Sequence, residues 1–319
     1  MQRYIVRRLL SLLPTLFGVS LVIFVVMRAL PGDVARQILT GGGSGQGVTQ
    51  EQVDRLRNQL GLNDPLPLQY WHWLSGVARL HPGDSLFTHH PIMDEISSRL
   101  PATIELAAGA VVVALLIAVP IGVLSALYQD RSIDYLFRVV SVAGLSLPGF
   151  LLGELLIFAL ERYFHYVRPA GFASLWADPR KNIEQMIEPV LVLGYGFSAI
   201  LSRVTRSAML DVLREDYVRT ARAKGLRPGP VVLRHALRNA LLPVVTIAGL
   251  QLGALLGGAV ITESVFALPG LGRYLVTSIV QLDYPVTQMI VMLSGVTFVL
   301  LNTGVDLAYA LIDPRIRYD

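Results

Sequence analysis

Six apolar runs of 16 to 27 residues decide what this 319-residue chain can fold into. A helix needs about 20 apolar residues to cross the hydrocarbon core of a bilayer, where every backbone polar group must be satisfied internally. The runs therefore predict an all-α membrane protein with six transmembrane helices. They are Leu9–Leu30, Ala102–Leu127, Val139–Leu160, Met186–Leu201, Val244–Ile261 and Val286–Ile312.

The composition supports the membrane class. Hydrophobic residues make up 53% of the chain, charged residues only 16%, and the mean hydropathy is +0.54. Soluble domains carry about 25% charged residues. The net charge of +4 comes from basic residues beside the predicted spans, so it does not indicate nucleic-acid binding. The chain has no cysteine, which excludes disulfides, thiol nucleophiles and thiolate metal sites.

One charged stretch between the apolar runs fixes the orientation. The basic segment, Arg203–Pro243, holds nine of the 27 basic residues and three acidic ones. Three further arginines, at positions 3, 7 and 8, precede the first run. The positive-inside rule places both groups in the cytoplasm. This requires Met186–Leu201 to count as a span, and it makes both termini cytoplasmic.

The predicted organisation has four parts. Residues 1–30 form the first transmembrane helix, 31–100 an extracytoplasmic segment of amphipathic helices, 101–312 a five-helix core, and 313–319 a cytoplasmic tail. In the second part, Thr49 and Gln52 make a capping box for a helix that Gly61 ends, and Pro65–Leu80 is a second, aromatic-rich helix. This part either packs on the bundle or serves as a platform for an external partner, and the two interpretations are compatible.

Polar residues inside apolar spans are costly and mark candidate pathways. Glu105, Glu154, Gln251 and Glu263 are predicted to line a translocation path for a hydrophilic solute, and Asp306 lies near the inner end of the last run. The alternative is that each one lies at an interface or forms a hydrogen bond between helices. Both interpretations stay open at this point.

Motifs of soluble enzymes are missing from the sequence. The neighbouring His89 and His90 have no H-E-x-x-H context, and no Walker or G-x-S-x-G sequence occurs. The glycine-rich stretch Gly41–Gly47 lacks the Lys-Ser/Thr of a phosphate-binding loop and is predicted to be a linker. We therefore expect no catalytic residue, no metal site and no cofactor bound by this chain, so that any ATP-driven process needs another subunit.

The basic segment has a helix–glycine–helix pattern. Leu213–Lys224 is predicted to be a helix that Gly225 ends, followed by a turn at Arg227–Pro230 and a second helix at Val231–Leu242. Two short helices at an angle would form a projecting knob.

Small side chains are expected on the face of this knob. Ala221 and Ala223 would let a partner approach closely, while the arginines would pair with acidic groups. The alternative is a basic loop on anionic lipid headgroups.

The motifs of the chain then resemble one family along its whole length. Arg219–Gly225 reads RTARAKG, and with the downstream Leu242-Pro243 it resembles the EAA loop of ABC-importer membrane subunits. The dipeptide/oligopeptide permease family, and specifically its B-type subunit, is indicated by EDYVRTARAKG and RHALRNALLPVVT, by the opening RRLLSLLPTLFGVSLVIF, by LGLNDPLPLQYW, by PGLGRYLV at Pro269–Val276 and by DPRIRY at Asp313–Tyr318.

Two positions depart from the general pattern of that family. Arg219 stands where the EAA loop has glutamate, and Thr220 where it has the first alanine. The Leu-Pro pair also falls a few residues late, at Leu242-Pro243 in place of Leu237-Arg238. The match to the EAA loop is therefore kept at Ala221 and Gly225 and not at Arg219.

The resemblance implies the type I ABC-importer permease fold and docking of the basic segment on a cytoplasmic ATPase. It implies these partners: a C-type permease as the other half of a heterodimer, two ATP-binding subunits that carry ATP and Mg, an extracytoplasmic solute-binding protein, and the lipid of a bacterial or archaeal plasma membrane. The implied cargo is a short peptide, with glutathione, nickel or another small solute as alternatives. The implied ATPase-coupling residues are Asp216, Tyr217, Arg219, Thr220, Ala221, Lys224 and Gly225.

Two other classes do not depend on the resemblance. One is a secondary transporter or channel that works alone, and the other is a membrane scaffold whose basic segment binds a different cytoplasmic protein. Transport without ATP would favour the first, and failure to recover an ATPase subunit with the chain would favour the second.

Overall fold

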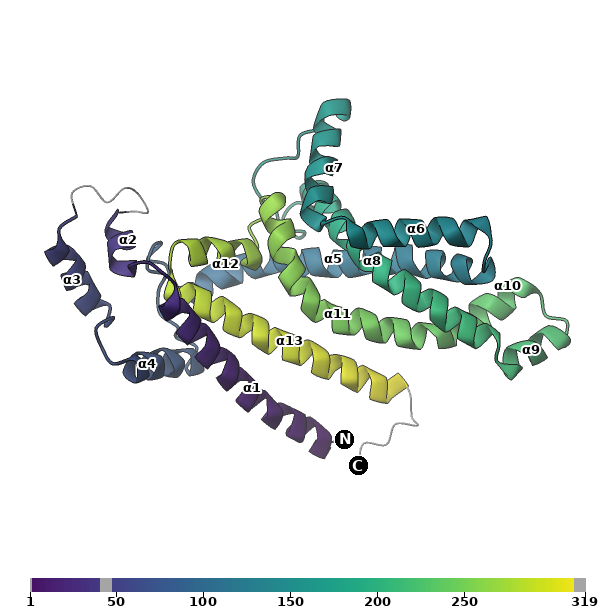
Figure 1. Ribbon diagram of the computed structural model, residues 1–319, viewed down its shortest axis with the longest axis horizontal. Coiled ribbons are helices and arrows are strands. Elements are labelled where there is room, and N and C mark those ends of the chain that lie inside the picture. The colour runs from purple at the N-terminus through teal and green to yellow at the C-terminus, as the bar shows by residue number, and fades with distance from the viewer. Residues whose placement is uncertain (1, 41–47, 313–319) are drawn as a thin grey trace. The chain divides into compact units, whose positions relative to one another are not determined.

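The computed structural model describes residues 2–40 and 48–312, with the side chains of 2–12, 254, 256–258 and 305–312 left out. In this part of the chain all regular elements are helices (Figure 1). They form two compact units: the first contains residues 2–40, 48–101 and 269–300, and the second contains residues 102–268 and 301–312. The predicted linker Gly41–Gly47, the predicted tail 313–319 and the side chain of Asp306 lie outside the described residues.

Between four and six segments are long and apolar enough to cross a membrane. Four are single helices: α5 (Ile92–Leu127), α8 (Pro179–Leu213), the helix that runs from Pro228 into α11 (Leu237–Val265), and α13 (Tyr284–Ile312). Two more are bent pairs: α1 (Gln2–Ala29) with α2 (Val34–Thr40), and α6 (Ser132–Ser146) with α7 (Gly149–Phe164). The all-helical membrane class is confirmed, and the count of six spans stays a prediction.

The predicted span Val139–Leu160 is not one continuous helix, because α6 and α7 meet at a bend of 101°. Pro148 has no N–H to continue the helix, and its ring pushes Leu147 out of the helical region. Leu147 accordingly has φ −86° and ψ 123°, and Pro148 precedes α7 with φ −58° and ψ 135°. The Leu147-Pro148 pair was the signal for this bend.

The amphipathic helices of the first unit follow the sequence closely. In α3 (Gln50–Gln59) the Thr49 hydroxyl accepts from the backbone N–H of Gln52, whose side chain accepts from the N–H of Thr49, and Gly61 follows with φ +64°. The helix α4 (Leu66–Ala78) packs on α1: Tyr70 and Ser20 share a hydrogen bond of 2.7 Å between their hydroxyls. This part of the outer segment therefore packs on the first long helix.

The remaining short helix of the first unit is α12 (Leu271–Val280). Its apolar face packs against the beginnings of α5 and α13, where Ile92, Leu271 and Val286 lie in one buried cluster. Asp283, between α12 and α13, is buried and accepts a hydrogen bond of 2.6 Å from the Ser85 hydroxyl. Burial raises the pKa of the Asp283 carboxyl.

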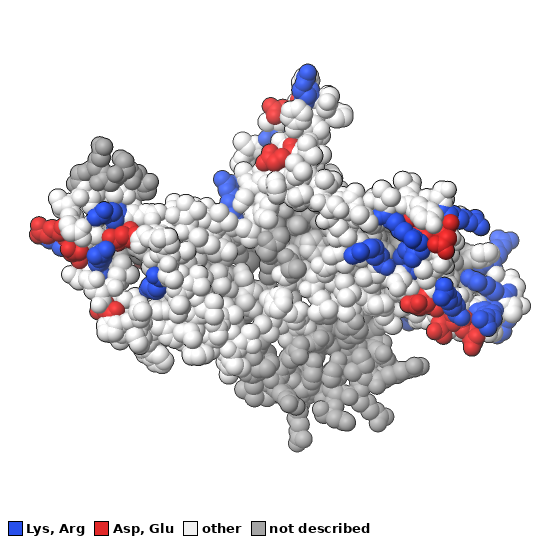
Figure 2. All heavy atoms as spheres, in the orientation of Figure 1, with Lys and Arg blue, Asp and Glu red and all other residues white. Residues whose placement is uncertain are grey.

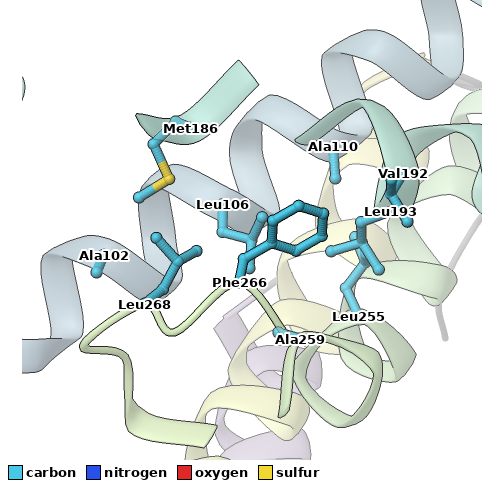
Figure 3. Close-up of a cluster of buried hydrophobic side chains, with 10 residues drawn as sticks. All are labelled: Ala102, Leu106, Ala110, Met186, Val192, Leu193, Leu255, Ala259, Phe266 and Leu268. Carbon is cyan, nitrogen blue, oxygen red and sulfur yellow. The ribbon is translucent and has the colours of Figure 1, made fainter. Parts of the chain in front are cut away.

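The core of the second unit lies where α5, α8 and α11 meet. The ring of Phe266 is 1% exposed and lies within the cluster drawn in Figure 3. Close helix contact there depends on small residues: a Cβ at Gly194 would lie 2.7 Å from Cγ1 of Val113. The cluster consists of Ala102, Leu106, Ala110, Met186, Val192, Leu193, Leu255, Ala259, Phe266 and Leu268.

Candidate functional site

The basic segment folds as a knob, defined here as residues 216–236, at one end of α8 and α11. The first helix of the knob is α9 (Asp216–Ala223). The sequence predicted a helix from Leu213, but Leu213 is the last residue of α8, and Glu215 is extended with φ −66° and ψ 147°. The chain therefore breaks before α9, and α9 turns away from the long helix (Figure 1).

The end of α9 at Gly225 is confirmed. The N–H of Gly225 donates to the carbonyl of Arg222 over 2.9 Å, and Gly225 has φ +76°. A Cβ placed there would meet no atom within 4 Å. Glycine is therefore required by the left-handed backbone and not by crowding.

The second half of the knob differs from the predicted turn at Arg227–Pro230. Pro228–Pro230 forms the first helical turn, α10, and the reversal lies just before it, because proline suits the first position of a helix. A π-helix, Val231–Ala236, then leads without a break into α11. Its wider bonding is visible where the N–H of Leu237 donates to the carbonyl of Val232.

The inside of the knob is a small apolar cluster. Val218 and Val231 are fully buried and Ala221 is 8% exposed, with Val212 and Leu213 packed beside them. The expectation that Ala221 lies on the outer face is wrong, since its small side chain lets α9 pack on the π-helix. Ala223 does lie on the surface. A contact of Ala221 with a partner subunit stays a prediction.

The outer face of the knob carries the other predicted coupling residues. Asp216, Tyr217, Arg219, Thr220, Lys224 and Gly225 are all exposed. Arg219 lies 3.3 Å from Asp216 with both side chains almost fully in solvent, so this pair contributes little to stability. Asn239 of α11 donates to the Tyr217 hydroxyl over 2.7 Å. Figure 2 shows Lys and Arg gathered over the end of the second unit that carries α9 and α10.

A buried carboxylate below the knob was missed by the sequence analysis. Asp134 of α6 is fully buried, and its two carboxylate oxygens accept hydrogen bonds of 2.9 and 2.8 Å from Nε and Nη2 of Arg206 on α8. Arg138 adds a bond of 2.6 Å and the Ser125 hydroxyl of α5 another. Asp134 thus joins α5, α6 and α8. The signal was an acidic residue at the start of a helix followed four residues later by arginine.

Of the predicted path residues, Gln251 lines a cavity. It contributes to a pocket of about 190 Å³ between α7, α8 and α11, beside the bend that follows α6. The wall is otherwise mainly apolar, with Phe150, Val192 and Phe197 among its residues.

The three predicted path carboxylates lie elsewhere. Glu263 is fully buried and accepts a hydrogen bond of 2.6 Å from Thr103, so it joins α11 to α5. Glu105 accepts from Asn182 over 2.7 Å and so joins α5 to the beginning of α8. Glu154 is exposed on α7. Glu105 and Glu263 therefore have the interhelical contacts of the structural alternative, and a role of these residues in a path stays a prediction.

The loop between α7 and α8 is held by polar contacts. Gln185 donates to the carbonyl of Pro169 over 2.9 Å and accepts from the N–H of Ala173 over 3.1 Å. Arg168 donates to the carbonyl of Phe266. Burial lowers the pKa of the Arg168 guanidinium, and the negative charge of Glu188 opposes this shift. Among the described residues, no three histidine or carboxylate side chains lie together in a way that could hold a metal ion.

These features define a multi-pass membrane protein with an ordered, basic, projecting knob that continues into two long helices of its core. The chain belongs to the family of binding-protein-dependent transport system inner membrane components, whose model matches residues 118–318. The model of the N-terminal part of such membrane components matches residues 1–107. The protein is therefore a permease subunit of an ABC importer, and in such systems separate subunits hydrolyse ATP.

Curated relatives match the chain from end to end. It is 42% identical over 318 residues to the glutathione transport system permease protein GsiC of Escherichia coli strain K12, with 100% of both chains covered. The protein of that name from Shigella flexneri serotype 5b has the same identity and coverage. The resemblance to the dipeptide/oligopeptide permease family is thereby confirmed.

Solved structures share the fold at low sequence identity. An inward-facing structure of the MetNI methionine ABC transporter matches with a TM-score of 0.55 and 18% identity, covering 69% of this chain and 97% of that one. A crystal structure of an amino acid ABC transporter with histidines matches with a TM-score of 0.51 and 16% identity, covering 70% and 95%.

Proposed function

We propose that this chain forms half of the translocation pathway of an ATP-driven importer for short peptides. The observation that carries the proposal is the knob, which has its own buried cluster and continues directly into α11. Because the knob is packed and ordered, a displacement of the knob would also displace α11. A flexible basic loop would deform and leave α11 in place. We further propose that the chain has six spans, that both termini are cytoplasmic, and that it resides in a bacterial inner membrane.

The proposed partners follow from the family to which the chain belongs. Two ATP-binding subunits would hold ATP and Mg, in keeping with the absence of a recognisable nucleotide-binding motif in this sequence, and this chain would bind no cofactor. A C-type permease would complete the pathway, and an external solute-binding protein would deliver the cargo. Lipid would surround the apolar helix faces.

The mechanism would be alternating access driven through the knob. Closure of the ATPase dimer moves the knob, and the movement passes to α8 and α11, between which the knob is connected. The Asp134 contacts with Arg206 and Ser125 would carry the movement on to α6 and α5 as one body. Such rigid-body shifts are typical of packed helices that have two discrete arrangements.

We favour short peptides as the cargo because of the resemblance to the dipeptide/oligopeptide permease family. Glutathione has support of its own in the name of the 42% identical relatives. Nickel or another small solute in the same architecture is a further alternative. A stand-alone secondary transporter is the alternative of a different class.

The test is reconstitution of the complete complex in liposomes. The chain is co-expressed with its neighbouring permease, ATPase and binding-protein genes, and uptake of labelled dipeptides, tripeptides and glutathione is measured with ATP inside or absent. Uptake that needs both ATP and the binding protein, with peptides transported faster than glutathione, supports the proposal. Uptake by the isolated chain without ATP contradicts the importer assignment, and preference for glutathione contradicts the peptide assignment alone.

A further inference from the structure

The pocket between α7, α8 and α11 has one polar group without a partner. Gln251 is half-buried in the middle of an apolar helix and lines the pocket. No hydrogen bond joins its carboxamide to another described residue, and the side chain is not fully buried. The carboxamide is therefore available to pair with a polar group that enters the pocket.

Two glycines keep the pocket open. Gly149 and Gly196 both line it, neither has a positive φ, and a Cβ on either would meet nothing within 4 Å. Neither backbone handedness nor crowding therefore requires glycine there. Gly194, two residues before Gly196 on α8, is different, because a Cβ there would lie 2.7 Å from Val113. The glycines of the pocket leave space, whereas Gly194 lets helices meet.

The size of the pocket limits what it can hold. Its volume is about 190 Å³. Sites that enclose a whole small-molecule ligand occupy about 300–1,000 Å³, whereas an apolar cavity of about 150 Å³ holds one benzene. The pocket is therefore suited to one aliphatic or aromatic side chain and not to a complete peptide.

We infer that this pocket is a cargo subsite that receives one apolar side chain of a peptide while Gln251 pairs with the adjacent peptide bond. A carboxamide offers both donor and acceptor, as does a backbone amide, so the two can pair in both directions. A lipid acyl chain would fill the apolar space but would leave Gln251 unpaired. The inference rests on the proposed function, and it names the class of cargo: peptides with a large apolar side chain, in preference to glutathione.

The test compares two peptides in the reconstituted complex. A Cβ at Gly196 would meet nothing within 4 Å, and the rest of a leucine side chain would occupy the pocket. In Gly196→Leu, uptake of Ala-Phe should therefore fall about tenfold relative to uptake of Ala-Ala, because a well-filled apolar site discriminates by about this factor. For each peptide, uptake by the variant is divided by uptake by the wild type. Since both complexes use the same binding protein, its own preference for one peptide cancels in this ratio. Gly18→Leu is the matched control, because Gly18 is also a helical glycine with nothing within 4 Å but does not line the pocket.

The role of Gln251 is tested separately. Gln251→Met keeps the length of the side chain and removes its hydrogen bonds, so uptake of both peptides should fall about fivefold, the usual effect of one lost hydrogen bond. An unchanged Ala-Phe to Ala-Ala ratio in Gly196→Leu, together with unchanged uptake in Gln251→Met, overturns the inference and leaves a lipid tail or a partner side chain as occupant.

A direct readout covers the case in which Gly196→Leu does not fold. A dipeptide that carries a photoreactive phenylalanine should label α7, α8 or α11 of the wild-type complex beside the pocket, and Gly196→Ala should weaken that labelling. Labelling confined to other helices overturns the inference. Failure of the proposed function is distinct, since wild-type complex would then show no ATP-dependent uptake of any peptide.

Discussion

The side-chain amide of Asn239 donates a hydrogen bond to the hydroxyl of Tyr217 over 2.7 Å, and this bond ties α9 to α11. The two residues lie 22 positions apart in the sequence, with the whole turn of the knob between them. The bond therefore joins the first turn of α9 to the first turn of α11.

Removing this bond should loosen α9. We expect Tyr217→Phe to lower the free energy of local opening by about 1 kcal/mol, the usual net value of one hydrogen bond, so that the amides of α9 exchange about fivefold faster. Hydrogen exchange of the purified chain measures this directly. Tyr163→Phe, at an exposed tyrosine of α7, is the control and should leave α9 unchanged. Equal exchange rates in Tyr217→Phe and wild type would show that the bond is not maintained in solution.

Ala221 and Ala223 should respond differently to the same substitution. Ala221→Leu overfills the cluster of Val218 and Val231 and should destabilise the knob by about 1–3 kcal/mol, so trypsin should cleave it faster at Arg219, Arg222 and Lys224.

Ala223 is exposed, so Ala223→Leu should leave the trypsin pattern of the isolated chain unchanged. If this face contacts the ATPase, Ala223→Leu should lower the amount of ATPase that purifies with the chain. Faster cleavage in Ala223→Leu than in Ala221→Leu would contradict the arrangement of α9.

At Gly225 the handedness of the backbone should matter more than the size of the side chain. With φ +76° and open space around the Cβ position, Gly225→Asn should keep most of the uptake, because asparagine tolerates the left-handed region. Gly225→Val should cost about 1–2 kcal/mol or more in the same conformation and abolish uptake while the chain still inserts into the membrane. Uptake and substrate-stimulated ATP hydrolysis are the measurements. Normal values of both in Gly225→Val would rule out a coupling role.

The buried carboxylate of Asp134 should be a major source of stability at the knob end of the second unit. Asp134→Asn leaves Arg206 with poor partners and should destabilise the chain by about 1–3 kcal/mol, seen as a lower Tm in detergent. Asp130→Asn is the control, because Asp130 is largely exposed and its contact with Arg138 is long, at 3.3 Å. Its effect should be below about 1 kcal/mol. Equal shifts in the two variants would contradict the buried network.

Local signals allowed much of the fold to be predicted. The capping box of Thr49 and Gln52, the stop at Gly61 and the stop at Gly225 depend on neighbours in the sequence, so they could be recognised from the sequence alone. The bend at Leu147-Pro148 also depends on local sequence, because proline disfavours a helical conformation of the residue before it. It was not predicted because the surrounding apolar run has the length of one continuous span.

The partners of buried groups could not be predicted in this way. Ala221 is buried because the π-helix packs against α9, and the sequence of α9 alone does not show this contact. Asp134 meets Arg206 only because α6 packs on α8. Glu263 is similar, because only the position of Thr103 on α5 shows that its carboxylate joins two helices. Tertiary packing, which no single stretch of sequence encodes, decided each of these residues.

The π-helix at Val231–Ala236 has a consequence for how this permease can vary. Each residue turns an α-helix by about 100°, so deleting one residue between Pro230 and Leu237 would restore α-helical bonding and rotate α9 about the axis of α11 by that angle. A single codon lost or gained there would point the same arginines in a different direction. The direction in which the knob points is therefore set by chain length. Under the proposed docking, the fit to an ATPase would then change without the exchange of any side chain.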